Sequence, residues 1–265
     1  VSLGFSLAPL MLAAMIATTG WRASLWLLAL ACTAFGLVAL LLLRNHPEEC
    51  GVRVDGHSAD TGDAPTQIIP SATLAEARRS PVFWIASLSL SMHSLFGTAV
   101  TFHIVSIFDA AGRPQSEAFG VFLPMAIAST SCNLLAGWLA DTRPLKPFLV
   151  LMLAAFISGG LGLLYLDSAT GYWLMVTGLG VGGGLWSVIS NLAFIRNFGP
   201  LHLGEISGLC TSIMVFTSAI GPALFALGLD LTGSYLVPEL LCLGGLLLLL
   251  LGAILIPHRS EQLVH

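Results

Sequence analysis

The side chains that could do chemistry in this 265-residue sequence are few, and most of them lie inside long apolar runs. His93 and His103 are the titratable candidates, because no Asp, Glu, Lys or Arg falls in the middle of any run. Ten residues apart on a helix, they would differ by about 80° in direction and ~15 Å in height. Both could border one cavity and contact a solute or a proton, or each could be a hydrogen-bonded packing residue.

Polar groups in other runs extend this candidate pathway. Ser129 and Asn133 share one helix face, and the Asn133 amide can both donate and accept hydrogen bonds, which suits a carboxylate or a carbonyl. The same amide could instead join two helices. Thr211 and Ser218 precede Pro222, which frees a backbone carbonyl and lets a helix bend, although this polar stripe could also be a packing seam. The predicted solute or proton pathway consists of His93, His103, Ser129, Asn133, Trp186, Ser190, Asn191, Thr211 and Ser218.

Enzyme motifs are missing from the sequence. It contains no H-E-x-x-H metal pair, no G-x-x-x-x-G-K-[ST] phosphate loop and no G-x-S-x-G elbow. The stretch around Ser207 resembles an intramembrane serine-protease site only loosely, with one residue too many. The net charge of −4 argues against a nucleic-acid partner. We therefore expect a protein that is not an enzyme and that uses no cofactor or metal.

Composition places these residues in a membrane. Hydrophobic residues make up 56% of the chain and charged residues 9%, against about 25% charged in a soluble domain. Eight runs are long enough to cross a bilayer core of ~30 Å as helices, and none alternates as a barrel strand would. The sequence predicts an all-α membrane bundle with helices near residues 1–18, 24–43, 82–108, 117–139, 148–166, 172–195, 206–229 and 235–256.

Lys and Arg residues lie mainly in alternate joints between these runs. One side collects eight of them and the other collects only Arg22 and Arg113. The positive-inside rule predicts that the first side is cytoplasmic, in a cell (inner) membrane, and that it holds the long polar loop and the C-terminus. The predicted domains are residues 1–43, the loop 44–80 and residues 81–265. The eight are Arg44, Arg53, Arg78, Arg79, Arg143, Lys146, Arg196 and Arg259.

A repeat links the two ends of the chain. Pro9 and Pro222 lie in corresponding runs, and each is followed eleven residues later by a glycine, Gly20 or Gly233, that starts a predicted outside turn. The period is six helices, and secondary transporters are commonly built from six-helix halves. Two helices before the loop and six after it then predict that four helices are missing at the front, so that the chain is an N-terminally truncated piece.

The joint at residues 137–146, GWLADTRPLK, resembles the cytoplasmic loop motif of the major facilitator superfamily. Gly137, Asp141, Arg143 and Lys146 match the motif, whereas Thr142 and Pro144 depart from it. Residues 9–22 and the loop entry NHPEECG are similar to the monocarboxylate and oxalate–formate exchanger branch. The matching residues, together with Pro222, are predicted to gate the transporter.

The resemblance implies helices five to twelve of a twelve-helix secondary transporter, monomeric when complete. Its partners would be the lipid bilayer, a small solute such as a monocarboxylate-like organic anion, and a coupling proton. Transport would occur by alternating access between the two halves. The alternative is a truncated membrane protein or scaffold that transports nothing, because half of the cavity wall would be absent.

Overall fold

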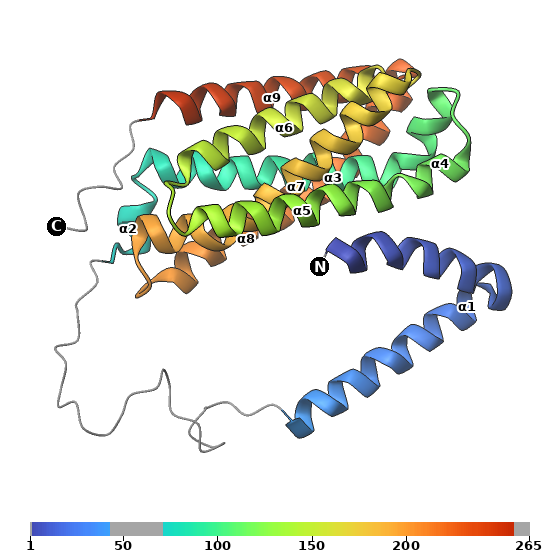
Figure 1. The fold of residues 1–265 in the computed structure, drawn as a ribbon, viewed down its shortest axis with the longest axis horizontal. Coiled ribbons are helices and arrows are strands. Elements are labelled where there is room, and N and C mark those ends of the chain that lie inside the picture. Colours follow the sequence, from blue (N-terminus) through green and yellow to red (C-terminus); the bar gives the residue numbers. More distant parts are fainter. Residues whose placement is uncertain (1, 43–70, 257–265) are drawn as a thin grey trace. The chain divides into compact units, whose positions relative to one another are not determined.

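The computed structural model describes residues 2–42 and 71–256, and helices account for almost all of this part (Figure 1). Within these residues there is no strand, so the all-α prediction is confirmed. In chain order the helices are α1 (Ser2–Leu42), α2 (Leu74–Ala77), α3 (Pro81–Ala110), α4 (Gln115–Gly120), α5 (Phe122–Ala140), α6 (Lys146–Leu164), α7 (Ala169–Phe198), α8 (Leu203–Thr232) and α9 (Leu236–Leu255).

The chain forms two compact units, Ala8–Ile68 and a larger one made of Val1–Leu7 with Ile69–His265. In α1 the helical backbone breaks at Gly20, which has φ 78° and ψ 159°. Gly233, at the end of α8, has φ 70°. Both glycines that the predicted repeat placed at turns therefore adopt the positive φ that favours a residue without a Cβ.

Seven helical segments in the described residues are long and apolar enough to cross a membrane. This is one fewer than predicted, and the difference lies in the first run. The span in α1 is Ala14–Leu42, which runs across the break at Gly20, and residues 2–19 before the break coincide with the predicted first run. The other six spans match the predicted runs and lie in the larger unit, and the multi-pass membrane assignment holds.

α7 packs against α6 at almost backbone contact. A Cβ added to Gly178 would collide with the backbone N of Gly159, and one added to Gly182 would lie 2.5 Å from the ring of Phe156. Small residues allow helices to approach this closely in a membrane, where dispersion and not the hydrophobic effect holds them together. The Gly178/Gly182 pair therefore provides close packing.

The second glycine pair of α7 faces α5. A Cβ on Gly180 would lie 2.7 Å from the Cβ of Ala128, and one on Gly184 would lie 2.5 Å from the carbonyl O of Ser129. α7 is thus held between two helices by glycines on two of its faces. At these four glycines there is no room for even a methyl group between α7 and its two neighbours.

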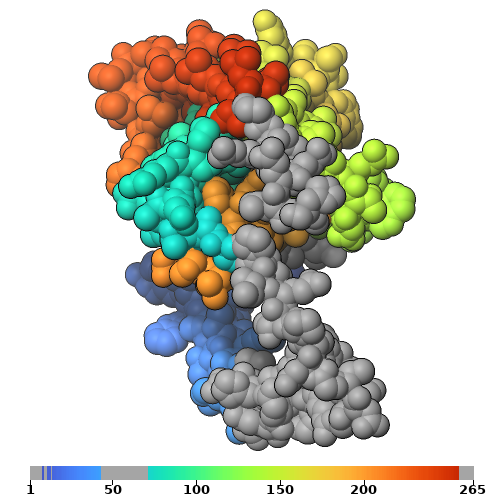
Figure 2. All heavy atoms as spheres, turned by 90° about the vertical axis from the view of Figure 1, so that its left-hand side faces the viewer, coloured from blue at the N-terminus to red at the C-terminus, as the bar shows by residue number. Residues whose placement is uncertain are grey.

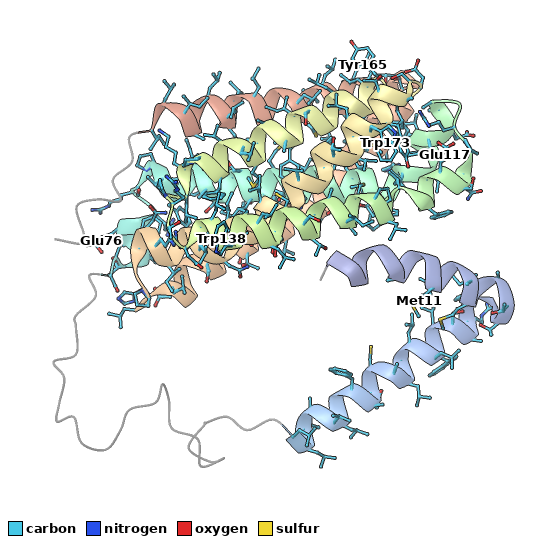
Figure 3. All side chains as sticks on the ribbon, in the orientation of Figure 1. Met11, Glu76, Glu117, Trp138, Tyr165 and Trp173 are labelled. Atoms are coloured by element: carbon cyan, nitrogen blue, oxygen red, sulfur yellow. The ribbon has the colours of Figure 1, made fainter. Side chains whose placement is uncertain are left out.

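The two ends of the larger unit differ in charge. The end that we call the basic end carries all but one of the described Arg and Lys side chains of this unit, and Figure 2 looks onto it. The opposite end, called the Arg113 end, contains the remaining one. Figure 3 shows Tyr165 and Trp173 at the Arg113 end and Trp138 at the basic end, and all three are exposed, as in aromatic belts at membrane interfaces. The basic end consists of Arg78, Arg79, Arg143, Lys146 and Arg196.

The residues just before α3 are strapped to the α7–α8 turn. The backbone N–H of Ala72 donates to the carbonyl of Phe198 (2.8 Å), and Leu201 N–H donates to Ser71 Oγ (3.4 Å). A short helix, α2, lies in this segment, and its N-cap is Thr73. Thr73 and Glu76 form a capping box, and the hydrogen bonds from Thr73 lower the pKa of the Glu76 carboxyl.

Substituting Gly178 with Ala tests the α6–α7 contact. The added methyl would force the two backbones apart, and overpacking of this kind costs about 1–3 kcal/mol. We expect a lower melting temperature in detergent, measured by fluorescence-detected gel filtration. The matched control is Gly244→Ala in α9, where a Cβ meets nothing within 4 Å. Equal melting temperatures for the two variants would contradict the packing argument.

Candidate functional site

A cavity of about 1030 Å³ lies among five helices of the larger unit. Its walls come from α3, α5, α6, α7 and α8, and they are apolar apart from hydroxyl, amide, indole and imidazole groups. No Asp, Glu, Lys or Arg side chain lines it in the described part of the chain. Seven of the nine predicted pathway residues contribute to this one wall: His93, Ser129, Trp186, Ser190, Asn191, Thr211 and Ser218.

The imidazole of His93 is held at the cavity by aromatic rings. It stacks on Phe156, with ring centroids 4.5 Å apart and an 18° angle between the planes, and it lies 5.1 Å from the ring of Trp186. Its Cε1 would be 3.4 Å from a Cβ placed on Gly97, so the ring covers that glycine. No hydrogen bond to either ring nitrogen is present among the described residues. The nitrogens therefore remain available to a ligand.

The other polar groups of the wall are hydrogen-bonded mainly within their own helices. Ser190 Oγ and Asn191 Nδ2 both donate to the Ser187 carbonyl, at 3.0 and 2.7 Å, and Ser218 Oγ donates to the Val215 carbonyl at 2.9 Å. This local bonding uses the donors and leaves hydroxyl and amide oxygens as acceptors. Rotation of a hydroxyl can present its hydrogen instead, so the wall can solvate either a donor or an acceptor on a solute.

His103 does not line the cavity, contrary to the prediction that both histidines border it. Its Nε2 lies 3.1 Å from the Pro222 carbonyl of α8, and its Nδ1 lies 3.2 Å from Tyr235 Oη at the start of α9. The physical reason is that α8 and α9 offer two polar partners on the side of α3 that is turned away from the cavity. The contacts of His103 are those of a hydrogen-bonded packing residue, which was the alternative role predicted for it.

Asn133 also lies outside the cavity wall. Its Nδ2 donates to the Gly184 carbonyl across the α5–α7 contact, at 3.3 Å. The close approach at Gly184 puts this backbone oxygen within reach of the amide. The alternative role, joining two helices, therefore fits the structure better than contact with a solute.

The residues of the loop motif make contacts within the larger unit. Lys146 Nζ donates to the carbonyls of Ile254 and Ile256 at 2.8 and 2.7 Å, which caps the C-terminus of α9. Arg196 Nη1 donates to the Arg143 carbonyl at 3.3 Å. A Cβ on Gly137 would meet nothing within 4 Å, so no described residue packs closely against it.

Asp141, the acidic member of the motif, is exposed. It forms no salt bridge within residues 2–42 and 71–256. The Lys146 ammonium does not pair with Asp141 in the described residues, because it is used by the end of α9. The gating role of the four loop residues stays a prediction.

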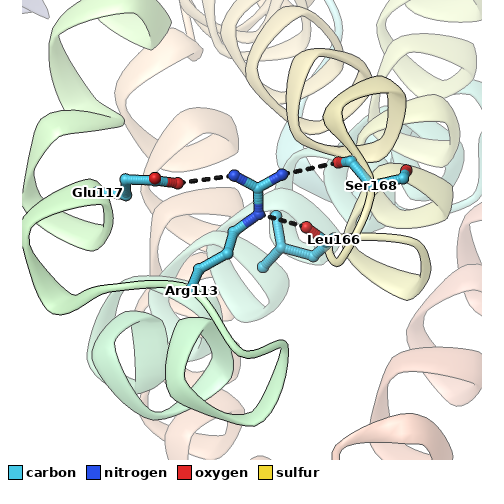
Figure 4. Close-up of polar contacts among 4 residues, drawn as sticks. All are labelled: Arg113, Glu117, Leu166 and Ser168. Atoms are coloured by element: carbon cyan, nitrogen blue, oxygen red, sulfur yellow. Dashed lines mark hydrogen bonds and ion pairs between the residues drawn. The ribbon is translucent and has the colours of Figure 1, made fainter.

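Arg113 joins two turns at the Arg113 end of the larger unit. Its guanidinium donates to the carbonyls of Leu166 and Ser168 and forms a salt bridge with Glu117 at 2.7 Å (Figure 4). It also lies over the ring of Tyr172, 4.9 Å from the centroid. These contacts tie the turn between α3 and α4 to the turn between α6 and α7.

Sequence reasoning missed Glu239, a carboxyl with 6% of its surface exposed in the first turn of α9. Ionisable side chains inside a membrane span are costly and commonly functional. The signal was present, because Glu239 is the fifth residue of the predicted run 235–256. It was passed over because it lies near the end of that run.

Residues 1–222 of the chain match the family model of the Major Facilitator Superfamily. The match spans both units and includes the loop motif and the cavity residues up to Ser218. No curated protein matches the chain at a significant level.

Two neighbouring positions of α8 test the position of the cavity. Thr211 lines it, whereas Cys210 is 1% exposed and faces inward. In an otherwise cysteine-free protein, we expect Thr211→Cys to react with a charged methanethiosulfonate reagent at least tenfold faster than a protein that keeps only native Cys210. The measurement is the rate of mass increase. Similar rates would show that Thr211 does not face water.

Proposed function

The chain belongs to the major facilitator superfamily, and on that premise we propose that it transports a small solute by alternating access. Members of this family are membrane transporters. The observation that carries the proposal is the cavity of about 1030 Å³, which brings polar groups from α3, α5, α7 and α8 together inside a helical bundle. Polar groups inside a membrane are retained where a solute or ion needs them.

The solute is a small organic anion, of the monocarboxylate type suggested by the sequence resemblance. A carboxylate needs hydrogen-bond donors, and His93 supplies an imidazole N–H to the cavity wall in the described part of the chain. Its ring nitrogens are free and its ring is fixed by Phe156 and Trp186. The hydroxyls of Ser129 and Thr211 supply further donors.

The basic end faces the cytoplasm of a cell whose inner membrane holds the protein. Five described Arg and Lys residues lie at that end, against Arg113 alone at the other end of the same unit, and the positive-inside rule then gives the orientation. The loop motif lies at this cytoplasmic end, where exposed Asp141 remains available to the other half of the transporter. We infer that this contact forms the inner gate and that Pro222 lets α8 bend.

Uptake of labelled formate, acetate, lactate, pyruvate and oxalate into proteoliposomes that contain the full-length protein tests the proposal. We expect at least one of these anions to accumulate above protein-free vesicles. Absence of uptake for all five would reject the organic-anion proposal. Absence of uptake for neutral and cationic solutes as well would favour the alternative, a membrane scaffold without transport activity.

The role of His93 is tested by His93→Ala. Loss of a hydrogen bond to a charged group costs about 1.5–3 kcal/mol, so we expect the KM for the transported anion to rise by roughly tenfold or more. The matched control is His202→Gln, because His202 lies at the start of α8 and does not line the cavity. Unchanged uptake and pH dependence in His93→Ala would remove His93 from the mechanism.

A further inference from the structure

His103 is bonded at both ring nitrogens by groups from two other helices. Pro222 of α8 contributes its carbonyl to Nε2, and Tyr235 contributes its hydroxyl to Nδ1. The Tyr235 hydroxyl also reaches Ser106 Oγ, at 2.9 Å, one turn along α3 from His103. The ring of Phe225 stacks over the imidazole, with centroids 6.2 Å apart. The orientation of the imidazole is therefore fixed on all sides.

The hydrogen positions follow from the partners. A carbonyl can only accept, so Nε2 carries a hydrogen. The Tyr235 hydroxyl donates its own hydrogen to Ser106 Oγ, which leaves an oxygen lone pair for Nδ1. Both nitrogens thus face acceptors, and this is the arrangement that an imidazolium with two N–H groups requires. Hydrogen bonds from a charged donor are about twice as strong as neutral ones.

Release of the proton needs no movement of heavy atoms. When Nδ1 loses its hydrogen, the Tyr235 hydroxyl can turn from Ser106 to Nδ1 and donate to it. The imidazole keeps two hydrogen bonds in either state, so no buried polar group is left without a partner. A group with this property can bind and release protons reversibly inside the bundle.

The charged groups on the surrounding helices are mostly acidic. Glu239 lies one turn from Tyr235 on the buried face of α9, and Arg113 is already paired with Glu117. The titratable and charged groups of α3 and of the elements that pack against it at this end are Asp109, Arg113, Glu117, Tyr165, Tyr172, Asp230, Tyr235 and Glu239.

The hydrogen bond between His103 and the Pro222 carbonyl connects the surroundings of His103 to the cavity wall. Proline has no N–H, so α8 lacks one helical hydrogen bond at this point. Ser218, one turn earlier on α8, lines the cavity, and the backbone of Leu95 in α3 lies against Gly221. Gain or loss of charge on His103 therefore changes the strength of the hydrogen bond between α3 and α8, one turn from cavity-lining Ser218.

We propose that His103, with Tyr235, Ser106 and the Pro222 carbonyl, forms a proton-binding site separate from the solute cavity, and that this proton is the coupling ion. The coupling role rests on the proposed transport function. Proton binding itself does not rest on it and can be measured without any solute.

Nitrogen-15 NMR of histidine-labelled full-length protein tests proton binding, with His103→Gln identifying the signal among the seven histidines. We expect a signal with both nitrogens protonated at low pH. Tyr235→Phe removes the acceptor at Nδ1 but keeps the ring, so the midpoint of this signal should fall by about one pH unit. A His103 that stays neutral from pH 5 to 8, or an unchanged midpoint in Tyr235→Phe, would overturn the proposal.

Transport assays separate the coupling role from the transport function. With an anion that the wild-type protein carries, we expect His103→Gln to retain exchange of labelled for unlabelled anion within twofold while uptake driven by a pH gradient falls at least tenfold. Persistent response to the gradient would reject coupling through His103. Loss of exchange in correctly folded His103→Gln, judged by gel filtration, would show that the site is not separate from the cavity.

Discussion

The clamping of α7 between α5 and α6 is the constraint on which the site depends. Within a bilayer, lipid tails are as apolar as leucine, so helices gain little from hiding apolar surface and are held by close packing. Gly178 and Gly182 bring α7 onto α6, and Gly180 and Gly184 bring it onto α5. The cavity residues Trp186 and Asn191 follow directly on the same helix, and their positions are set by the glycines that precede them.

The sequence was sufficient to predict the all-α architecture and the six spans of the larger unit. Apolar runs and joints have compositions that differ sharply, and Gly20 and Gly233 adopt the backbone that their turns require. The positions of His103 and Asn133 could not be predicted. Each lies on the expected helix, but which side of that helix faces the cavity depends on the order in which helices neighbour one another. Composition and spacing do not contain that order.

The loop motif shows the same difficulty at longer range. Lys146 lies close to Asp141 in the sequence, yet it caps the end of α9, 108 residues farther along the chain. A lysine beside four unpaired carbonyls at a helix end finds a favourable partner there. Local spacing could not show that α9 ends beside the start of α6.

The two histidines of α3 differ in how their ring nitrogens are bonded. His93 is held by ring stacking alone and keeps both nitrogens open to the cavity, whereas His103 has both nitrogens bound. One helix thus carries an unsatisfied imidazole at the cavity and a satisfied one away from it. α8 contacts the same helix near both, and Pro222 lies between its cavity-lining part and Tyr235.

The strap between Ala72 and Phe198 affects how force passes along the chain. The segment that enters α3 is fastened to the α7–α8 turn by Ala72 and Ser71, and Trp84 Nε1 donates to the Arg78 carbonyl to hold its other end to α3. Tension applied upstream of Ser71 is therefore carried first by this turn, whose Gly199 has φ 77°. The start of α3 is thus held to the α7–α8 turn by described residues alone.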